Sequence, residues 1–226
     1  MSKIVHPYAH RLIILRDWKS RWFADPKKYC TYLKSDVLLR EYLEKKLRGM
    51  YVSGIEIERG EKTTRFIIKT SRPGLIIGRN GEGATKIKED ILKKMNKLGL
   101  KMTDDFKLEV VEIGNPEADA AIVAYMIAEG LEKRMPYRRV IKQVMEKVMS
   151  SRGVEGARIL LSGRLGGAEI ARSEELKRGS IPLQTFRADI DFKRERAKLP
   201  YGTIGIKVWI YRGKIFAEKS KKKETN

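Results

Sequence analysis

The sequence predicts an α+β protein of two domains, and three observations support this prediction. The chain has 226 residues, 42% of them hydrophobic, which is enough for packed cores and excludes a disordered basic protein. Helical periodicity and strand-like alternation follow each other in two separate sets along the chain. Between the sets lies Asn115-Pro116-Glu117, an N-cap residue followed by proline and an acid, which is typical of a helix start. We expect a domain boundary there.

Charge is the strongest compositional signal. Lysine and arginine together number 49 against 29 aspartates and glutamates, a formal net charge of +20. This excess indicates a polyanionic partner, and nucleic acid is the leading candidate. No apolar run approaches the ~20 residues of a membrane-spanning helix, and the first residues lack the apolar segment of a secretory signal. The single Cys30 excludes an internal disulfide framework and a cysteine-based zinc site, so we expect a cytoplasmic protein without metal or cofactor.

The chain is expected to begin with an extended arm, residues 1–16. Pro7 stands between His6 and His10, and it argues against a helix there and against a pair of metal ligands.

A helix is then predicted from Pro26, preceded by an aspartate at the N-cap, to Gly49, with a break near Ser35. Two strands with alternating apolar and polar residues follow, at 51–59 and 64–70.

A glycine-rich stretch, residues 72–83, joins the second strand to another helix; it reads Arg-Pro-Gly-Leu-Ile-Ile-Gly-Arg-Asn-Gly-Glu-Gly. Gly78 and Gly81 lack a Cβ, so another backbone can approach this turn closely. The unpaired amides that open the following helix favour an anion such as phosphate, and Arg79 adds a mobile positive charge. The spacing fits neither the Walker loop nor the dinucleotide-binding motif.

A Gly-x-x-Gly loop preceded by Ile-Ile-Gly is what a K-homology (KH) domain uses to hold a single-stranded nucleic-acid backbone. Gly-x-x-Gly alone is common and can be a helix start without a ligand. The Ile-Ile pair, Arg79 and the net charge favour RNA binding here. With a third strand at 106–113, the order of elements is that of a type II KH domain, predicted to span residues 17–114. The candidate loop residues are Arg72, Gly78, Arg79, Asn80 and Gly81.

Two helices are predicted to begin the second domain, one from Asn115 to about Lys133 and one from Pro136 to about Arg152. In the second, the apolar residues fall on one arc: Tyr137, Val140, Ile141, Val144 and Val148. Three cations cluster on roughly the opposite side: Arg138, Arg139 and Lys142. A solvated basic face would give the same pattern. The absence of an acid among the three, in so basic a chain, favours a surface that faces RNA.

The remaining pattern predicts an antiparallel sheet, with strands at 157–162, 181–192 and 204–211. The glycine-rich segment 163–172 precedes the second of these strands, and its glycines let the backbone press against a partner. A hairpin with a bulge is the alternative. The candidate residues of this segment are Arg164, Gly166, Gly167 and Arg172. The predicted second domain spans 115–214, followed by a basic tail at 215–226.

Nothing in the sequence indicates an enzyme. Asp189 and Asp191 share a face at strand spacing and could hold a metal, but Arg187 lies on the same face, and a local ion pair is the better interpretation. A nuclease or an NTP-driven helicase would need a metal set or a phosphate-binding Lys-Ser/Thr motif, and the chain has neither.

Residues 162–172, Ser-Gly-Arg-Leu-Gly-Gly-Ala-Glu-Ile-Ala-Arg, resemble the signature of one family, the third protein of the small ribosomal subunit in its bacterial form. Further segments of this chain agree with that family, in order and without large gaps: 72–74, 182–183, 187–191, 201–202 and 205–210.

The resemblance implies a protein of the subunit head, with a type II KH domain followed by two helices on an antiparallel sheet. It implies binding to small-subunit rRNA, including by the segment with Arg164 and Arg172, and a position lining the channel where mRNA enters. In the family, a basic triad matching Arg138, Arg139 and Lys142 faces mRNA and aids its unwinding. The family loop usually carries two basic residues between its glycines, whereas this chain has Asn80, which can donate to a phosphate oxygen without charge.

The neighbours implied are the tenth and fourteenth small-subunit proteins in the head, and the fourth and fifth where mRNA enters. The alternative function is a stand-alone KH-type regulator that binds single-stranded RNA. The second domain discriminates the two, because its glycine signature and basic helix suit permanent docking in a ribonucleoprotein.

Overall fold

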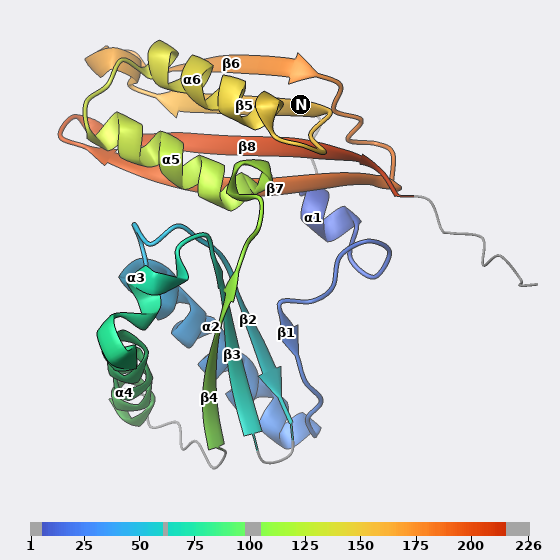
Figure 1. Ribbon diagram of the computed structural model, residues 1–226, viewed down its shortest axis with the longest axis vertical. Coiled ribbons are helices and arrows are strands. Elements are labelled where there is room, and N and C mark those ends of the chain that lie inside the picture. Colours follow the sequence, from blue (N-terminus) through green and yellow to red (C-terminus); the bar gives the residue numbers. More distant parts are fainter. Residues whose placement is uncertain (1–5, 61–62, 98–104, 216–226) are drawn as a thin grey trace, which may run out of the picture.

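A computed structural model describes residues 6–60, 63–97 and 105–215 of the chain. Its strands form two separate four-stranded sheets, one in each half of the sequence (Figure 1). This confirms the predicted α+β class with two domains. The predicted basic tail lies outside the described residues, apart from Ile215.

The N-terminal sheet has the strand order β1-β2-β3-β4. The strands are β1 (Ser20–Arg21), β2 (Val52–Arg59), β3 (Thr63–Thr70) and β4 (Asp105–Glu112). β2 and β3 form an antiparallel hairpin, whereas β1 and β4 pair in parallel with their neighbours. Three helices accompany this sheet: α2 (Pro26–Lys46), α3 (Pro73–Ile77) and α4 (Glu82–Lys97). The order of elements predicted for a type II KH domain is confirmed.

One face of this sheet carries both long helices. Apolar side chains at every second position of β2 and β3 meet those of α2 and α4, as strand and helix periodicities require. The buried cluster includes Leu39 and Leu43 from α2, Ile57 and Phe66 from the strands, and Ile91 from α4. Because this face is covered, the glycine loop is held between elements that pack into one core.

The predicted break in the first helix is wrong, since α2 is continuous through Ser35 and Asp36. Both residues are buried on the inner side of the helix. The Asp36 carboxylate accepts hydrogen bonds from the Arg59 guanidinium and from Trp22 Nε1 at 2.8 Å. A polar pair that resembled a helix interruption is instead a buried attachment point for β2 and for the segment that precedes α2.

The C-terminal sheet has the order β6-β5-β8-β7, and every neighbouring pair is antiparallel. Its strands are β5 (Gly156–Gly163), β6 (Arg172–Gly179), β7 (Ala188–Leu199) and β8 (Gly202–Lys214). Helices α5 (Ala120–Glu132) and α6 (Tyr137–Ser150) cover one face and share its largest buried cluster (Figure 1). The two-helix plus antiparallel-sheet architecture is confirmed.

Two strand boundaries differ from the predictions. No strand was predicted at 172–179, where β6 lies, and the strand expected at 181–192 begins only at Ala188. β6 is an edge strand that is largely exposed, so its sequence lacks the apolar alternation that marks a half-buried strand. Its pairing comes from β5, over the full length of both strands.

The helix expected to start at Asn115 starts later. Pro116–Ala118 forms a single 3₁₀ turn, and α5 begins at Ala120 with Asp119 as its N-cap. The Asp119 carboxylate accepts from the amides of Ala121 at 2.9 Å and Ile122 at 3.2 Å. It also accepts from the Ser53 hydroxyl of β2, so the cap of α5 joins the two domains. Burial, followed by the charge of Asp191, raises the pKa of Asp119.

The N-terminal arm is not extended throughout, because Pro7 opens a one-turn helix, α1 (Pro7–His10). Proline suits the first position of a helix, where its missing N–H would have no partner. Arg11 follows and is 1% exposed. Its guanidinium donates to the carbonyl oxygens of Pro7, Leu183, Thr185 and Ala188 at 2.7–3.0 Å.

Beyond Arg11 the arm stays on the C-terminal domain. Arg16 pairs with Asp189 at 2.6 Å, and β1 then adds to the edge of the N-terminal sheet. The arm is therefore fastened to the C-terminal domain and leads into the N-terminal sheet through β1, which the sequence did not predict.

Candidate nucleic-acid interface

The glycine loop lies between α3 and α4. Gly78 ends α3 with φ +71°, and a 3₁₀ turn over Arg79–Gly81 leads into α4. Asn80 and Gly81 also have positive φ, of 50° and 80°. The side chains of Arg79 and Asn80 are exposed at the start of a 16-residue helix, whose first amides and dipole favour an anion. The geometry thus suits a phosphate, as the motif predicts.

The closest backbone contact of the glycine-rich stretch is made by Gly83, which was not among the residues predicted for the loop. A Cβ on Gly83 would lie 2.5 Å from the carbonyl oxygen of Ile76 and 2.9 Å from that of Ile77. A Cβ on Gly81 would meet nothing within 4 Å. Glycine inside a helix is unfavourable unless packing requires it, and that is the signal that could have identified Gly83. It lets the first turn of α4 lie against the last turn of α3.

Replacing Gly83 with alanine is expected to lower the free energy of unfolding by about 2 kcal/mol, because the added methyl group meets backbone atoms that cannot rotate away. Gly74→Ala is the matched control, since a Cβ there meets nothing within 4 Å and its φ is not in the left-handed region. Denaturant unfolding of both variants measures the difference. Equal effects of the two changes would show that the close contact is not required.

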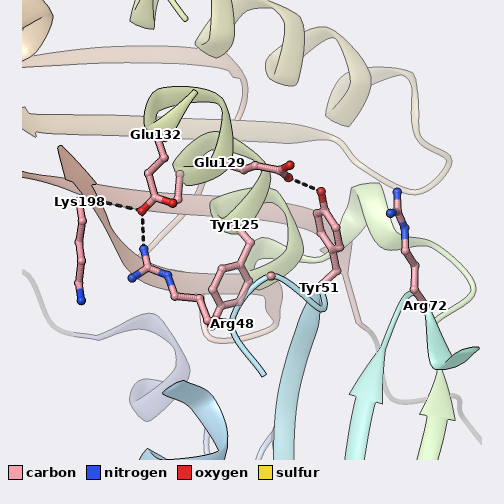
Figure 2. Close-up of a pocket in the computed structure, with 9 residues that line it drawn as sticks. Arg48, Tyr51, Arg72, Tyr125, Glu129, Glu132 and Lys198 are labelled. Carbon is pink, nitrogen blue, oxygen red and sulfur yellow. Dashed lines mark hydrogen bonds and ion pairs between the residues drawn. The ribbon is translucent and has the colours of Figure 1, made fainter. Parts of the chain in front are cut away.

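Arg72, predicted as part of the loop site, lies at the junction of the domains instead. Its guanidinium carbon lies 4.7 Å from the centre of the Tyr51 ring. Figure 2 shows both residues lining a cavity of about 680 Å³ together with Tyr125 and Glu129 of α5. The Tyr51 hydroxyl donates to Glu129. The structure therefore places the Arg72 side chain at the contact between the domains.

The same cavity is closed on one side by Arg48. Its Nη2 donates to Glu132 Oε1 at 2.7 Å and to the Arg196 carbonyl oxygen at 2.7 Å. Glu132 also accepts from the backbone N–H of Lys198 at 3.0 Å (Figure 2). Burial raises the pKa of the Tyr125 hydroxyl to about 12. These contacts tie the end of α2 to α5 and β7.

The basic cluster of α6 is presented as the sequence predicts. Arg138, Arg139 and Lys142 are exposed, while five apolar residues of the same helix are buried against the sheet: Val140, Ile141, Val144, Met145 and Val148. An α-helix with one face fixed in a core holds the other face toward solvent. Replacing the cations therefore leaves the packing of α6 untouched.

The glycine-rich segment after β5 lies beside the start of α6. Leu165 is buried in the cluster beneath the helices, and a Cβ on Gly166 would lie 3.7 Å from Cε1 of Tyr137. Gly166 and Gly167 have φ of +67° and +83°, so both occupy the left-handed region that favours glycine. The segment is the loop of the β5–β6 hairpin, with the 3₁₀ turn Leu165–Gly167 at its start.

Two arginines of this segment have different surroundings. Arg164 donates from Nε to the Ala168 carbonyl oxygen at 2.9 Å and from Nη1 to that of Tyr201 at 3.2 Å. It therefore braces its own loop. Arg172 opens β6 and is exposed.

A hydrogen bond joins the basic cluster of α6 to the β5–β6 hairpin. Arg138 Nε donates to Glu174 Oε1 of β6 at 3.1 Å, and this hydrogen bond raises the pKa of Arg138. We define the helix–loop surface as Arg138, Arg139, Lys142, the loop 164–171, Arg172 and Glu174. The structure thus brings two of the predicted sites together, whereas the glycine loop belongs to the other domain.

The two aspartates of β7 form ion pairs and hydrogen bonds with other elements of the protein. Asp189 pairs with Arg16 at 2.6 Å, and Asp191 pairs with Arg212 at 3.0 Å and accepts from the Ala120 amide at 2.9 Å. In the described ranges, no group of three or more His, Cys, Asp or Glu side chains is arranged to hold a metal. Nor is any helix in that part of the chain both long and apolar enough to cross a membrane.

Comparison with known proteins agrees with this architecture. A family model for the C-terminal domain of ribosomal protein S3 matches residues 127–210, and a KH-domain model matches 38–118. The small ribosomal subunit protein uS3 of Caldicellulosiruptor bescii is 46% identical over 220 residues, which cover 97% of this chain and 96% of its own length. This chain belongs to the uS3 family.

Other uS3 proteins show the same extent of similarity. That of Maridesulfovibrio salexigens is 46% identical over 95% of this chain and 97% of its own length. That of Pseudomonas aeruginosa is 43% identical over 95% of this chain and 91% of its own length. The uS3 family is the one that the segment 162–172 resembles, so that prediction is confirmed.

Proposed function

We propose that this uS3-family chain is a structural, non-enzymatic constituent of the small ribosomal subunit head. In this proposal it binds small-subunit rRNA and lines the channel where mRNA enters, with the helix–loop surface toward mRNA. The observation that carries the proposal is the exposed triad Arg138, Arg139 and Lys142 on a helix whose opposite side is buried. Cations held in this way can contact phosphates without any change in the fold.

The glycine loop is proposed to hold rRNA. Gly78, Arg79, Asn80 and Gly81 lie at the start of α4, where the dipole and the first turn of the helix favour an anion such as phosphate. Only Arg79 carries charge within the loop, so Asn80 contributes a hydrogen bond at most.

In the second domain, rRNA is proposed to contact the loop backbone at Gly166 and Gly167 and the side chain of Arg172. Arg164 supports this loop from within. The domain limits 1–16, 17–114, 115–214 and 215–226 belong to the same proposal, as do the four neighbouring proteins named above and a cytoplasmic, ribosome-bound location. Family membership along both domains favours this function over that of a stand-alone RNA-binding regulator.

The decisive variant replaces Arg138, Arg139 and Lys142 with alanine. We expect it to fold and to enter subunits, since exposed charges contribute little to folding. Loss of three phosphate contacts weakens binding of single-stranded RNA by up to about 50-fold at physiological salt. Ribosomes that carry the variant should translate unstructured mRNA nearly normally and slow severalfold ahead of a stable hairpin. The measurement is the elongation rate through matched messages with and without the hairpin.

The matched control keeps the charge and changes the side chains: Arg138→Lys, Arg139→Lys and Lys142→Arg together. If the triad acts through its charge on phosphates, this variant passes the hairpin at nearly the normal rate. Equal slowing of the alanine variant on both messages, or no slowing on either, would contradict a role for the triad in opening mRNA structure.

A further inference from the structure

Two carboxylates lie within the helix–loop surface, Glu169 in the loop and Glu174 on β6, and it is Glu174 that pairs with a cation of the triad. Glu174, on the edge strand β6, accepts a hydrogen bond from Nε of Arg138 at 3.1 Å. Within the described part of the chain, neither Arg139 nor Lys142 has an acidic side chain within 4 Å. Glu174 therefore acts on one cation of the triad and leaves the other two free.

We propose that Glu174 is an electrostatic brake that lowers the affinity of Arg138 for the RNA backbone. This inference rests on the proposed function, in which the triad contacts mRNA. An RNA that moves through a channel must be bound and released at each step, so a contact of limited strength suits the site better than a tight one.

The geometry allows an RNA phosphate to bind while the pair persists. The hydrogen bond to Glu174 uses the Nε–H of Arg138, and a guanidinium carries four further N–H donors on its Nη atoms. The Arg138 side chain is 70% exposed, so those donors can reach a phosphate oxygen. The carboxylate stays beside the phosphate in that complex, and its negative charge opposes that of the phosphate.

The ion pair between Glu174 and Arg138 also breaks and re-forms easily. The side chain of Glu174 is 34% exposed, and exposed ion pairs contribute little because solvent screens them. A phosphate can therefore displace the carboxylate from Arg138, and the carboxylate can recapture the guanidinium when the RNA moves on. Glu174 is held in place for this by the pairing of β6 with β5.

The next residue offers a matched control. Glu175 lies on the opposite face of β6, since strand side chains alternate, and it pairs with Arg158 at 2.6 Å. Changing either glutamate to glutamine removes the same charge from the same strand. Only the change at position 174 removes it from the helix–loop surface.

The test measures binding of a short fluorescent oligouridine to the full chain at physiological salt, for Glu174→Gln and Glu175→Gln. Glutamine at 174 keeps an oxygen that can accept from Arg138 Nε and removes the charge. Freeing one cation is equivalent to about one phosphate contact, so Glu174→Gln should tighten binding roughly fourfold relative to Glu175→Gln. In an Arg138→Ala background the two glutamine variants should bind equally. Thermal unfolding checks that all variants are folded.

Equal binding by Glu174→Gln and Glu175→Gln would overturn the brake. Weaker binding by Glu174→Gln would overturn it too, because the carboxylate would then be positioning Arg138 for RNA. If Arg138→Ala weakens binding and the two glutamine variants do not differ, the brake fails and the proposed role of the triad stands. If Arg138→Ala leaves binding unchanged, Arg138 does not contact the RNA, and the brake fails.

Discussion

Replacing Asp36 with alanine is expected to lower the free energy of unfolding by about 3–5 kcal/mol, the largest effect of a single change considered for this chain. The Asp36 side chain is 1% exposed and that of its partner Arg59 is 5% exposed. Arg59 approaches the carboxylate with Nε at 3.1 Å and also with Nη2, and Trp22 Nε1 donates at 2.8 Å. Without Asp36, a buried guanidinium loses its countercharge and an indole N–H loses its acceptor.

The measurement is denaturant unfolding of the full chain. Glu89→Ala is the matched control, because Glu89 forms an exposed pair with Lys93 at 3.9 Å and its removal should leave stability nearly unchanged. The double variant Asp36→Leu with Arg59→Met should recover much of the loss, since apolar residues of similar size leave no charge buried. An effect of Asp36→Ala no larger than that of the control would contradict a structural role for the buried pair.

Replacing Arg11 with methionine is expected to lower the free energy of unfolding by about 3 kcal/mol, because four carbonyl oxygens lose their donor in a site closed to water. Three of these carbonyls belong to the C-terminal domain, at Leu183, Thr185 and Ala188. The arm should therefore detach from that domain, and backbone hydrogen exchange should rise in residues 6–16.

Arg16→Met is the control for the arm. Arg16 forms one partly exposed ion pair with Asp189, so its loss should cost less stability and less protection than the loss of Arg11. Normal protection of residues 6–16 in Arg11→Met would contradict the idea that this side chain fastens the arm.

Local patterns predicted the regular elements well. The apolar residues of α6 recur at helical spacing. Of the predicted arc, Val140, Ile141, Val144 and Val148 are buried and Tyr137 is half-buried, while Met145 is a further buried residue. β2 and β3 were predicted within one residue at each end. In these elements one face is buried and the other is exposed, so the spacing of the apolar residues indicates which side chains are buried.

Where the pattern failed, contacts distant in sequence decided the outcome. Ser35 and Asp36 indicated a break in α2, although Asp36 is bound by Arg59 from β2. The edge strand β6, which contains Glu174, was not predicted because its residues do not alternate between apolar and polar. Arg164 donates hydrogen bonds to the carbonyl oxygens of Ala168 and Tyr201, and its position in the sequence indicates neither partner. None of these partners is predictable from spacing, because each comes from another element.

The sequence by itself determined the family, the two-domain class, the glycine loop at the start of α4 and the basic face of α6. These features depend on charge, glycine positions and periodicity within single segments. The tertiary structure alone decided that the signature loop lies beside α6, that Arg72 belongs to the domain junction, and that Glu174 meets Arg138. The physical reason is that a hydrogen bond or ion pair between segments requires two backbones to be placed within a few ångströms. That placement depends on the packing of both cores.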